Sequence, residues 1–246
     1  MSIFEKLLNV ITKKGAAFVI LIDPDRKDLD SITERVESAN EAGADALFIG
    51  GSLMMDSKCA ERVKKIKSIS KLPIIFFPGG VGQLNQYYDA MLFMSVISGR
   101  NPHYLIGEQV IAAPLVKDLG LEVIPTGYIL IDGGSASAVE IMSGTRPIPM
   151  ERIDIAVAHA LAGQYLGMKL IYLEAGSGAE QPVSNKIISS VRKAIDLPIV
   201  VGGGIIYPRL AEKAVKSGAS IVVVGNKFEN DLNFIKEFAS AIHKRL

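Results

Sequence analysis

The sequence of 246 residues contains a single cysteine and carries almost no net charge. One thiol cannot form an internal disulfide, so the chain fits a reducing compartment and we expect a cytoplasmic protein. Its 27 lysine and arginine residues nearly balance 26 acidic ones, for a net charge of +1. Such a balance creates no overall field that attracts nucleic acid or an anionic membrane surface, and we expect no nucleic-acid partner.

Long hydrophobic runs are also missing. Charged residues, Gly or Pro interrupt every apolar stretch before the ~20 residues that a membrane span needs, so we expect no transmembrane segment. Residues 1–12 have the spacing of a short amphipathic helix rather than that of a secretory leader. Because 49% of the residues are apolar and 22% are charged, the composition excludes intrinsic disorder and supports a sizeable core.

Short apolar runs rich in Val and Ile recur eight times along the chain. They are apolar at consecutive positions, which is typical of parallel strands covered on both faces. Segments with helical spacing and charged outer faces lie between most of them. The expected strands are 17–22, 46–49, 73–77, 90–94, 122–130, 169–174, 198–201 and 220–224, and the clearest helices are 31–42, 59–69, 187–194, 210–216 and 232–244.

Eight strand signals that alternate with helix signals predict an α/β fold, a (β/α)8 TIM barrel. A doubly wound open sheet is the alternative, but it would not need eight strands of such even spacing. Residues 42–50 and 217–225 repeat one helix-end, strand and glycine pattern, which indicates a repeated unit of one barrel rather than two domains. We therefore expect a single domain over residues 1–246. Within it, residues 132–149 are Gly/Ser-rich and long for a loop, which indicates a mobile or functional segment.

Glycine clusters follow the sixth, seventh and eighth expected strands. In a barrel, the loops after the strands form the active site, and those after strands seven and eight commonly hold a phosphate group. Glycines let backbone N–H groups approach an anion closely. The alternative is that they only terminate turns, but three clusters at consecutive strand ends favour a phosphate site. The clusters are Ala175-Gly176-Ser177-Gly178, Gly202-Gly203-Gly204 and Gly225-Asn226.

Oxygen ligands for a cation follow the first two strands. Asp23 comes directly after the first, and Ser52 follows Gly50 and Gly51 after the second. A carboxylate and a hydroxyl suit Mg²⁺, which keeps waters and substrate phosphate oxygens as its other ligands. The alternative is that the acidic residues here, Asp25 and Asp28 among them, cap the following helix.

Glu174 closes an apolar strand just before a glycine cluster. Such a carboxylate could accept hydrogen bonds from substrate hydroxyl groups and act as a general base. The structural alternative is an ion pair with a nearby lysine or arginine. Cys59 lies in a helical stretch without a patterned histidine partner and is expected to be inert.

The ordered set of motifs resembles the geranylgeranylglyceryl phosphate synthases and the related heptaprenylglyceryl phosphate synthases. The resemblance covers nearly the whole chain, and the order and spacing of the motifs make it specific. In one branch of the family a lysine stands two residues before the first aspartate, where this chain has Leu21. The motifs are LIDPD at 21–25, GGS at 50–52, FPG at 77–79, SGRNP at 98–102, PTGY at 125–128, YLEAGSG at 172–178, VGGGI at 201–205 and VGN at 224–226.

This resemblance implies a barrel prenyltransferase of ether-lipid, and hence phospholipid, biosynthesis. The family joins a prenyl diphosphate to the 3-hydroxyl of sn-glycerol 1-phosphate and releases diphosphate; the product passes to membrane enzymes. Carried over by position, Asp23 and Ser52 would hold Mg²⁺, and Glu174 would be the catalytic base. The residues that would bind glycerol phosphate are Tyr172, Leu173, Glu174, Ala175, Gly176, Ser177, Gly178, Gly203, Gly204, Gly225 and Asn226.

A long isoprenoid needs an apolar path away from the barrel mouth, and residues 87–106 supply apolar and aromatic side chains suited to it. Ordinary core packing is the alternative for each of these side chains. The donor length stays open between geranylgeranyl and heptaprenyl. A different phosphate-binding barrel enzyme (an isomerase or aldolase) and a non-catalytic carrier also stay open as functions. The apolar content further leads us to expect a homo-oligomer, a dimer or hexamer.

Overall fold

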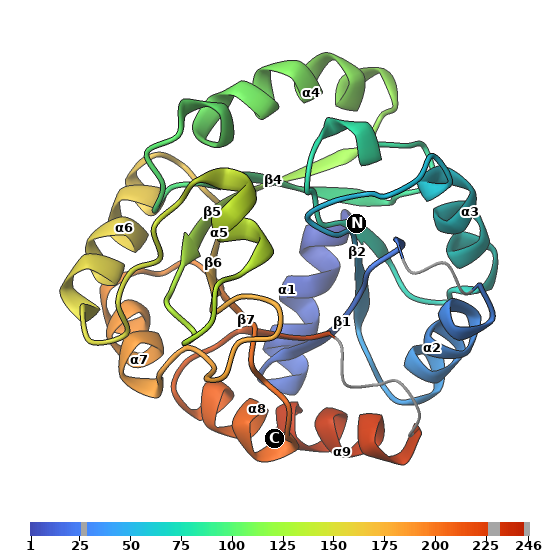
Figure 1. Cartoon of the computed structure of the whole chain (residues 1–246). Helices are drawn as coiled ribbons and strands as arrows, with labels where there is room; N and C mark the ends of the chain where they lie inside the picture. The colour runs from blue at the N-terminus through green and yellow to red at the C-terminus, as the bar shows by residue number, and fades with distance from the viewer. Residues whose placement is uncertain (26–28, 226–231, 244–246) are drawn as a thin grey trace.

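The computed structural model describes residues 1–25, 29–225 and 232–243, and it confirms the predicted barrel (Figure 1). Eight parallel strands close in sequence order, with β8 pairing with β1. The predicted strand positions agree with the structure to within two residues at each end. The strands are β1 (Ala17–Ile22), β2 (Ala46–Ile49), β3 (Ile74–Phe76), β4 (Ala90–Val96), β5 (Glu122–Leu130), β6 (Leu170–Glu174), β7 (Ile199–Gly202) and β8 (Ile221–Val224).

Helices surround the barrel and cover its outer face (Figure 1). Apart from α1, η1, η2 and α5, each helix connects one strand to the next or, at the C-terminus, follows β8. The helices are α1 (Ile3–Lys14), α2 (Leu29–Glu41), α3 (Cys59–Ile69), the 3₁₀ turn η1 (Val81–Gln83), the π-helical turn η2 (His103–Gly107), α4 (Glu108–Asp118), α5 (Ala138–Ser143), α6 (Ile153–Tyr165), α7 (Asn185–Ala194), α8 (Pro208–Lys216) and α9 (Leu232–Ile242).

Helix α1 covers the amino-terminal end of the barrel and lies behind it in Figure 1. Its start is defined by a capping box, in which Ser2 accepts from the Glu5 amide and Glu5 accepts from the Ser2 amide. The carboxylate of Glu122 accepts hydrogen bonds from the amides of Ile3 and Phe4, which attaches the helix to the first residue of β5. Leu7 is buried against the barrel interior. This end of the barrel is closed, so a substrate must approach from the opposite end.

Two apolar cores follow from the alternation of side chains along each strand. In β6, Leu170 and Tyr172 lie among the residues that fill the barrel interior. Ile171 and Leu173 lie in the larger core between the barrel and its helices. The same alternation places Glu174, the next residue in the inward series, at the carboxyl-terminal mouth of the barrel.

Two segments differ from the sequence prediction. The stretch 132–149 is not a simple loop, because it contains α5, and a bridge between Ile131 and Ile148 joins its two ends. After β4, the chain forms η2 and α4, for which the sequence predicted no helix because the apolar residues of 103–118 show little helical periodicity. In the part of the chain that the structure describes, no helix combines the length and apolar character needed to span a bilayer.

Candidate active site

Asp23 lies at the mouth, directly after β1, with its carboxyl group against Gly51. A Cβ atom added to Gly51 would lie 2.6 Å from Asp23 Oδ1, so this contact requires a glycine. The Asp25 amide donates to Asp23 Oδ1 at 2.9 Å. The Asp25 carboxylate in turn accepts a hydrogen bond from the Met55 amide at 2.8 Å, which connects the loop after β1 to the loop after β2. Asp28 is outside the described residues.

Asp23 and Ser52 therefore follow the ends of two neighbouring strands, β1 and β2. Gly51, the residue before Ser52, is in close contact with the Asp23 carboxyl group. Asp23 and Ser52 both offer oxygen atoms, the ligands that Mg²⁺ prefers, and Ser52 lines a cavity at the mouth. Among the described residues, no three His, Cys, Asp or Glu side chains converge on a metal site. A cation here would depend on oxygen atoms of water and of a phosphate-bearing substrate, as is usual for Mg²⁺. The residues present fit such an ion.

Glu174 is buried at the mouth, with 7% of its surface exposed. Burial raises its pKa to about 7, while the hydrogen bond from the Gly176 amide and the hydroxyl of Tyr172 oppose this rise. The Gly176 amide donates to Glu174 Oε1 at 2.8 Å. Within the described residues Glu174 has no ion pair, so nothing there supports the structural alternative. A carboxyl group that is partly ionised near neutral pH is suited to accept a proton from a substrate.

Glycines bring the loops after β6 and β7 into direct contact at Glu174. Gly203 has a φ of +79°, and a Cβ there would lie 2.5 Å from Glu174 Oε1 and 2.7 Å from the Gly176 nitrogen. Gly204 has a φ of +66°, and a Cβ atom added there would collide with the backbone of Gln181 and Pro182. Backbone groups thus surround the carboxyl group closely, as in a site for a small anion.

The remaining residues that were predicted to bind phosphate fall into two groups: some have side chains in the core, and others lie on loops at the mouth. The side chains of Leu173 and Ala175 lie in the core between barrel and helices, so only their backbone can reach a ligand at the mouth. Ser177 and Gly178 are exposed on the loop that follows, and Gly225 lies near Leu21. Asn226 is outside the described residues, so its predicted role stays a prediction.

A paired glycine substitution tests this arrangement. Gly203→Ala should lower kcat and raise the KM for the phosphate acceptor together, by about tenfold or more each, because the new methyl group would displace the Glu174 carboxyl group. Gly167, between α6 and β6, has a similar φ of +83° but no atom within 4 Å of an added Cβ, so Gly167→Ala is the matched control for backbone strain alone. Steady-state kinetics on both variants measure the difference. Equal effects in the two variants would contradict the contact between Gly203 and Glu174.

An aromatic group forms the floor of the mouth. The rings of Tyr128 and Tyr172 lie 5.4 Å apart, and Phe77 lies 5.6 Å from Tyr172. Tyr128 is fully buried, and its hydroxyl group has no hydrogen-bond partner among the described residues. The sequence motifs contained Phe77 and Tyr128, but only the alternation of β5 and the closure of the barrel place both of them beside Tyr172.

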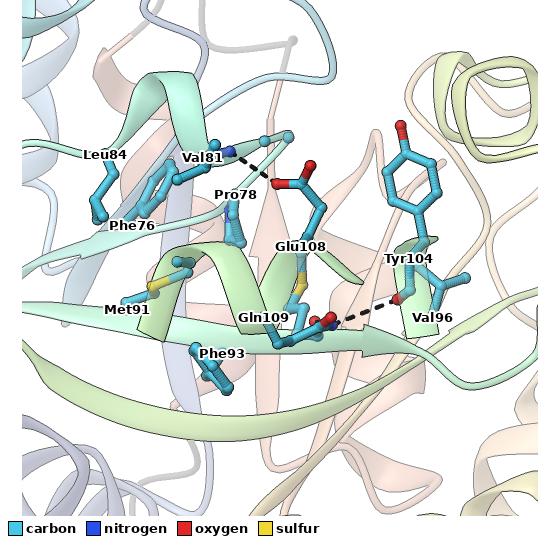
Figure 2. A pocket seen from close by; sticks show the side chains of 14 residues that line it. Phe76, Pro78, Val81, Leu84, Met91, Phe93, Val96, Tyr104, Glu108 and Gln109 are labelled. Atoms are coloured by element: carbon cyan, nitrogen blue, oxygen red, sulfur yellow. Dashed lines mark hydrogen bonds between the residues drawn. The ribbon is translucent and has the colours of Figure 1, made fainter. Parts of the chain in front are cut away.

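An apolar groove leads from the mouth toward α4. Figure 2 shows side chains of β3, β4, η1 and α4 around it. Of the expected groove residues, Met91, Phe93, Met94 and Tyr104 line it, whereas Leu92 points into the barrel and Tyr88 stacks on Phe76. A second apolar cavity, with Ser52, Phe77 and Tyr128 in its wall, shares five of its lining residues with this groove. The groove therefore adjoins the candidate metal ligand and the aromatic floor.

Two polar residues of α4 were missed by the sequence reasoning. Glu108 accepts from the Val81 amide at 2.9 Å (Figure 2). Its other carboxylate oxygen lies 2.8 Å from His103 Nε2, so Glu108 joins η1 to η2. Gln109 donates to the carbonyl groups of Met94 and Tyr104. A helix prediction at 108–118 would have indicated their positions.

These features define a class: a (β/α)8 barrel with glycine-rich loops around a buried carboxyl group and an apolar groove at one mouth. The sequence profile of the PcrB family matches residues 9–242. A geranylgeranylglyceryl phosphate synthase of Chitinophaga pinensis is 45% identical over 98% of this chain and 96% of that protein. One of Spirosoma linguale is 43% identical over 93% and 92%, respectively.

A crystal structure shows the same likeness in three dimensions. The (S)-3-O-geranylgeranylglyceryl phosphate synthase of Thermoplasma acidophilum, in complex with its substrate sn-glycerol-1-phosphate, has a TM-score of 0.93 and 31% identity and covers 99% of both chains. The chain belongs to the PcrB family, with the geranylgeranylglyceryl phosphate synthases, and is a prenyltransferase. This confirms the resemblance found in the sequence, and it removes the basis for an isomerase, an aldolase or a non-catalytic carrier.

Proposed function

We propose that this chain transfers a geranylgeranyl group from its diphosphate to the 3-hydroxyl group of sn-glycerol 1-phosphate. The products are geranylgeranylglyceryl phosphate and diphosphate, which makes this the first ether-forming step of an ether-lipid pathway. The observation that carries the proposal is the position of Glu174, buried between the glycine-rich loops and the aromatic floor of the mouth. The Thermoplasma relative, crystallised with sn-glycerol-1-phosphate, supports the choice of acceptor.

In this mechanism the glycine-lined backbone of the loops after β6 and β7 holds the acceptor phosphate. The ionised Glu174 carboxylate accepts the proton of the acceptor hydroxyl as its oxygen forms a bond to C1 of the prenyl group. The bond between C1 and the diphosphate oxygen breaks, and its electron pair leaves with diphosphate. The rings of Phe77, Tyr128 and Tyr172 exclude water and present π faces near C1 as it gains cationic character.

Asp23 and Ser52 would hold Mg²⁺ at the donor side of the mouth. When bound, the ion supplies positive charge that neutralises the departing diphosphate. The close contact between the Asp23 carboxyl group and Gly51 supports this assignment, because it places the carboxylate against the residue that precedes Ser52.

The decisive test is transfer of labelled prenyl chains onto sn-glycerol 1-phosphate, with C15, C20 and heptaprenyl diphosphates as donors. The highest kcat/KM is expected with the C20 donor. A clear preference for the heptaprenyl donor would replace the geranylgeranyl assignment, and no transfer with any donor would overturn the proposed reaction.

We also propose that the chain acts in the cytoplasm as a homo-oligomer. The single cysteine, which is buried, supports a reducing compartment. Val110, Ile111 and Leu115 expose about half or more of their surface along α4, as expected of a helix that packs against a second copy. Light scattering on the purified protein is expected to give a dimer or hexamer, and a monomeric mass would contradict it.

A further inference from the structure

Large apolar side chains are exposed around the mouth of the barrel. Leu53 and Met55 follow β2, Ile106 lies in η2 after β4, and Ile141 lies on α5 after β5. Between 52% and 72% of the surface of each is exposed. We call these four residues the mouth patch. In Figure 1, α5 lies in front of the barrel, at the end opposite α1.

The mouth patch borders the opening of the groove. Ser52, Tyr104 and Met142, which are close neighbours of its members in the chain, line one apolar cavity with Tyr128. The exposed apolar side chains therefore lie on the same loops as the lining of this cavity. Exposed apolar side chains at the edge of a site that handles a long hydrocarbon chain indicate contact with an apolar phase.

The charges on the segments that carry the mouth patch (51–58, 98–108 and 135–146) differ in exposure. Their carboxylates are only partly exposed, and two of them are paired: Asp56 with Arg62 at 2.7 Å, and Glu108 with His103. The third, Glu140, lies in the first turn of α5. The exposed lysine and arginine side chains there are Lys58, Arg100 and Arg146, against two exposed carboxylates on the adjoining loops, Asp132 and Glu180.

We infer that the mouth of the barrel docks on a lipid bilayer, with the mouth patch in the headgroup region and the basic side chains on anionic lipids. This inference rests on the proposed function, because the prenyl diphosphate donor and the prenylglyceryl phosphate product are both amphiphiles that partition into membranes. Docking at the mouth lets the donor chain pass from the bilayer into the groove without crossing water. The near-zero net charge of the whole chain predicted no such attraction, and the inference rests instead on the exposed apolar side chains at the mouth and the basic side chains beside them.

Vesicle sedimentation without any substrate tests the inference. Wild-type protein should sediment with phosphatidylcholine vesicles that contain phosphatidylglycerol, and less with phosphatidylcholine alone. The double variant Met55→Ser/Ile141→Ser should bind the mixed vesicles about tenfold more weakly, because two exposed apolar side chains no longer enter the lipid. Neither residue lines the groove, so transfer from a donor dispersed in non-ionic detergent should stay at the wild-type rate.

The matched control is Tyr165→Ser/Leu166→Ser. These side chains are 79% and 73% exposed but lie at the carboxyl-terminal end of α6, just before β6 and so at the opposite, amino-terminal end of the barrel. Full vesicle binding by the control supports the inference, and equal loss in both variants overturns it. A change in molar mass of the Met55→Ser/Ile141→Ser protein without a change in vesicle binding would also overturn it, since a second copy would then cover the patch. Because binding is measured without substrates, failure of the transfer assay bears on the proposed function separately.

Discussion

Glu174→Gln is expected to give a folded protein whose kcat for prenyl transfer falls by about 10²–10⁴-fold, the usual contribution of a general base. Glutamine keeps the shape of the side chain and can still accept the hydrogen bond from the Gly176 amide. It cannot take the proton of the acceptor hydroxyl. Steady-state kinetics and a melting temperature on the same preparation measure both quantities.

The stability of this variant distinguishes a base from a structural group. The pKa of Glu174 is raised in the folded protein from 4.5 to about 7, so folding favours the neutral form. Stability from this group is therefore present at low pH and is lost as the pH rises from about 4.5 through 7, by up to about 3 kcal/mol. Glu174→Gln avoids that loss and should be at least as stable as the wild type at pH 8. Breaking a buried ion pair would instead cost ~3–5 kcal/mol.

The same pKa gives a signature in the rate. Only the ionised carboxylate can accept the proton, so wild-type kcat/KM should rise with pH through about 7 and then level off. This inflection should be absent from the residual activity of Glu174→Gln. Glu180→Gln is the control, since Glu180 is exposed on the loop after β6. A Glu174→Gln protein with lost stability and near-normal turnover would show that Glu174 is structural.

Asp23→Asn is expected to lower turnover by about 10²-fold or more, because an amide is a poor ligand for Mg²⁺ beside a diphosphate. Thermal stability should hardly change, since asparagine can still accept the hydrogen bond from the Asp25 amide. Excess EDTA should abolish wild-type activity, and added Mg²⁺ should restore it. Calorimetric titration of Mg²⁺ in the presence of diphosphate should show binding to the wild type and much weaker binding to the variant.

Asp132→Asn is the control for this experiment. Asp132 is an exposed aspartate that also follows a strand at the mouth, and its carboxyl group accepts from the Gly134 amide at 2.9 Å. Near-normal turnover is expected in that variant. Full wild-type activity in EDTA, or a folded Asp23→Asn protein with normal rates, would remove the metal role of Asp23 and Ser52.

The sequence by itself determined the barrel and the ends of its strands. Consecutive apolar residues in eight evenly spaced runs are typical of buried parallel strands, and the glycines after them mark the mouth. Asp23, Ser52 and Glu174 could be identified for the same reason: each is polar where an apolar strand has just ended. These signals are local: each can be read from a short stretch of sequence without knowing which other residues it contacts in the fold.

Only the tertiary structure decided which of these residues face one another. Alternation along β6 turns Tyr172 and Glu174 inward and Leu173 outward, and closure of the sheet brings Phe77 and Tyr128 to the same floor. The pKa of Glu174 depends on burial by neighbours from other strands, which no local pattern encodes. Likewise, the groove combines β3 and β4 with α4, so its walls exist only after the helix packs on the barrel. Long-range contacts of this kind set the chemistry of the site, while short-range periodicity sets the scaffold.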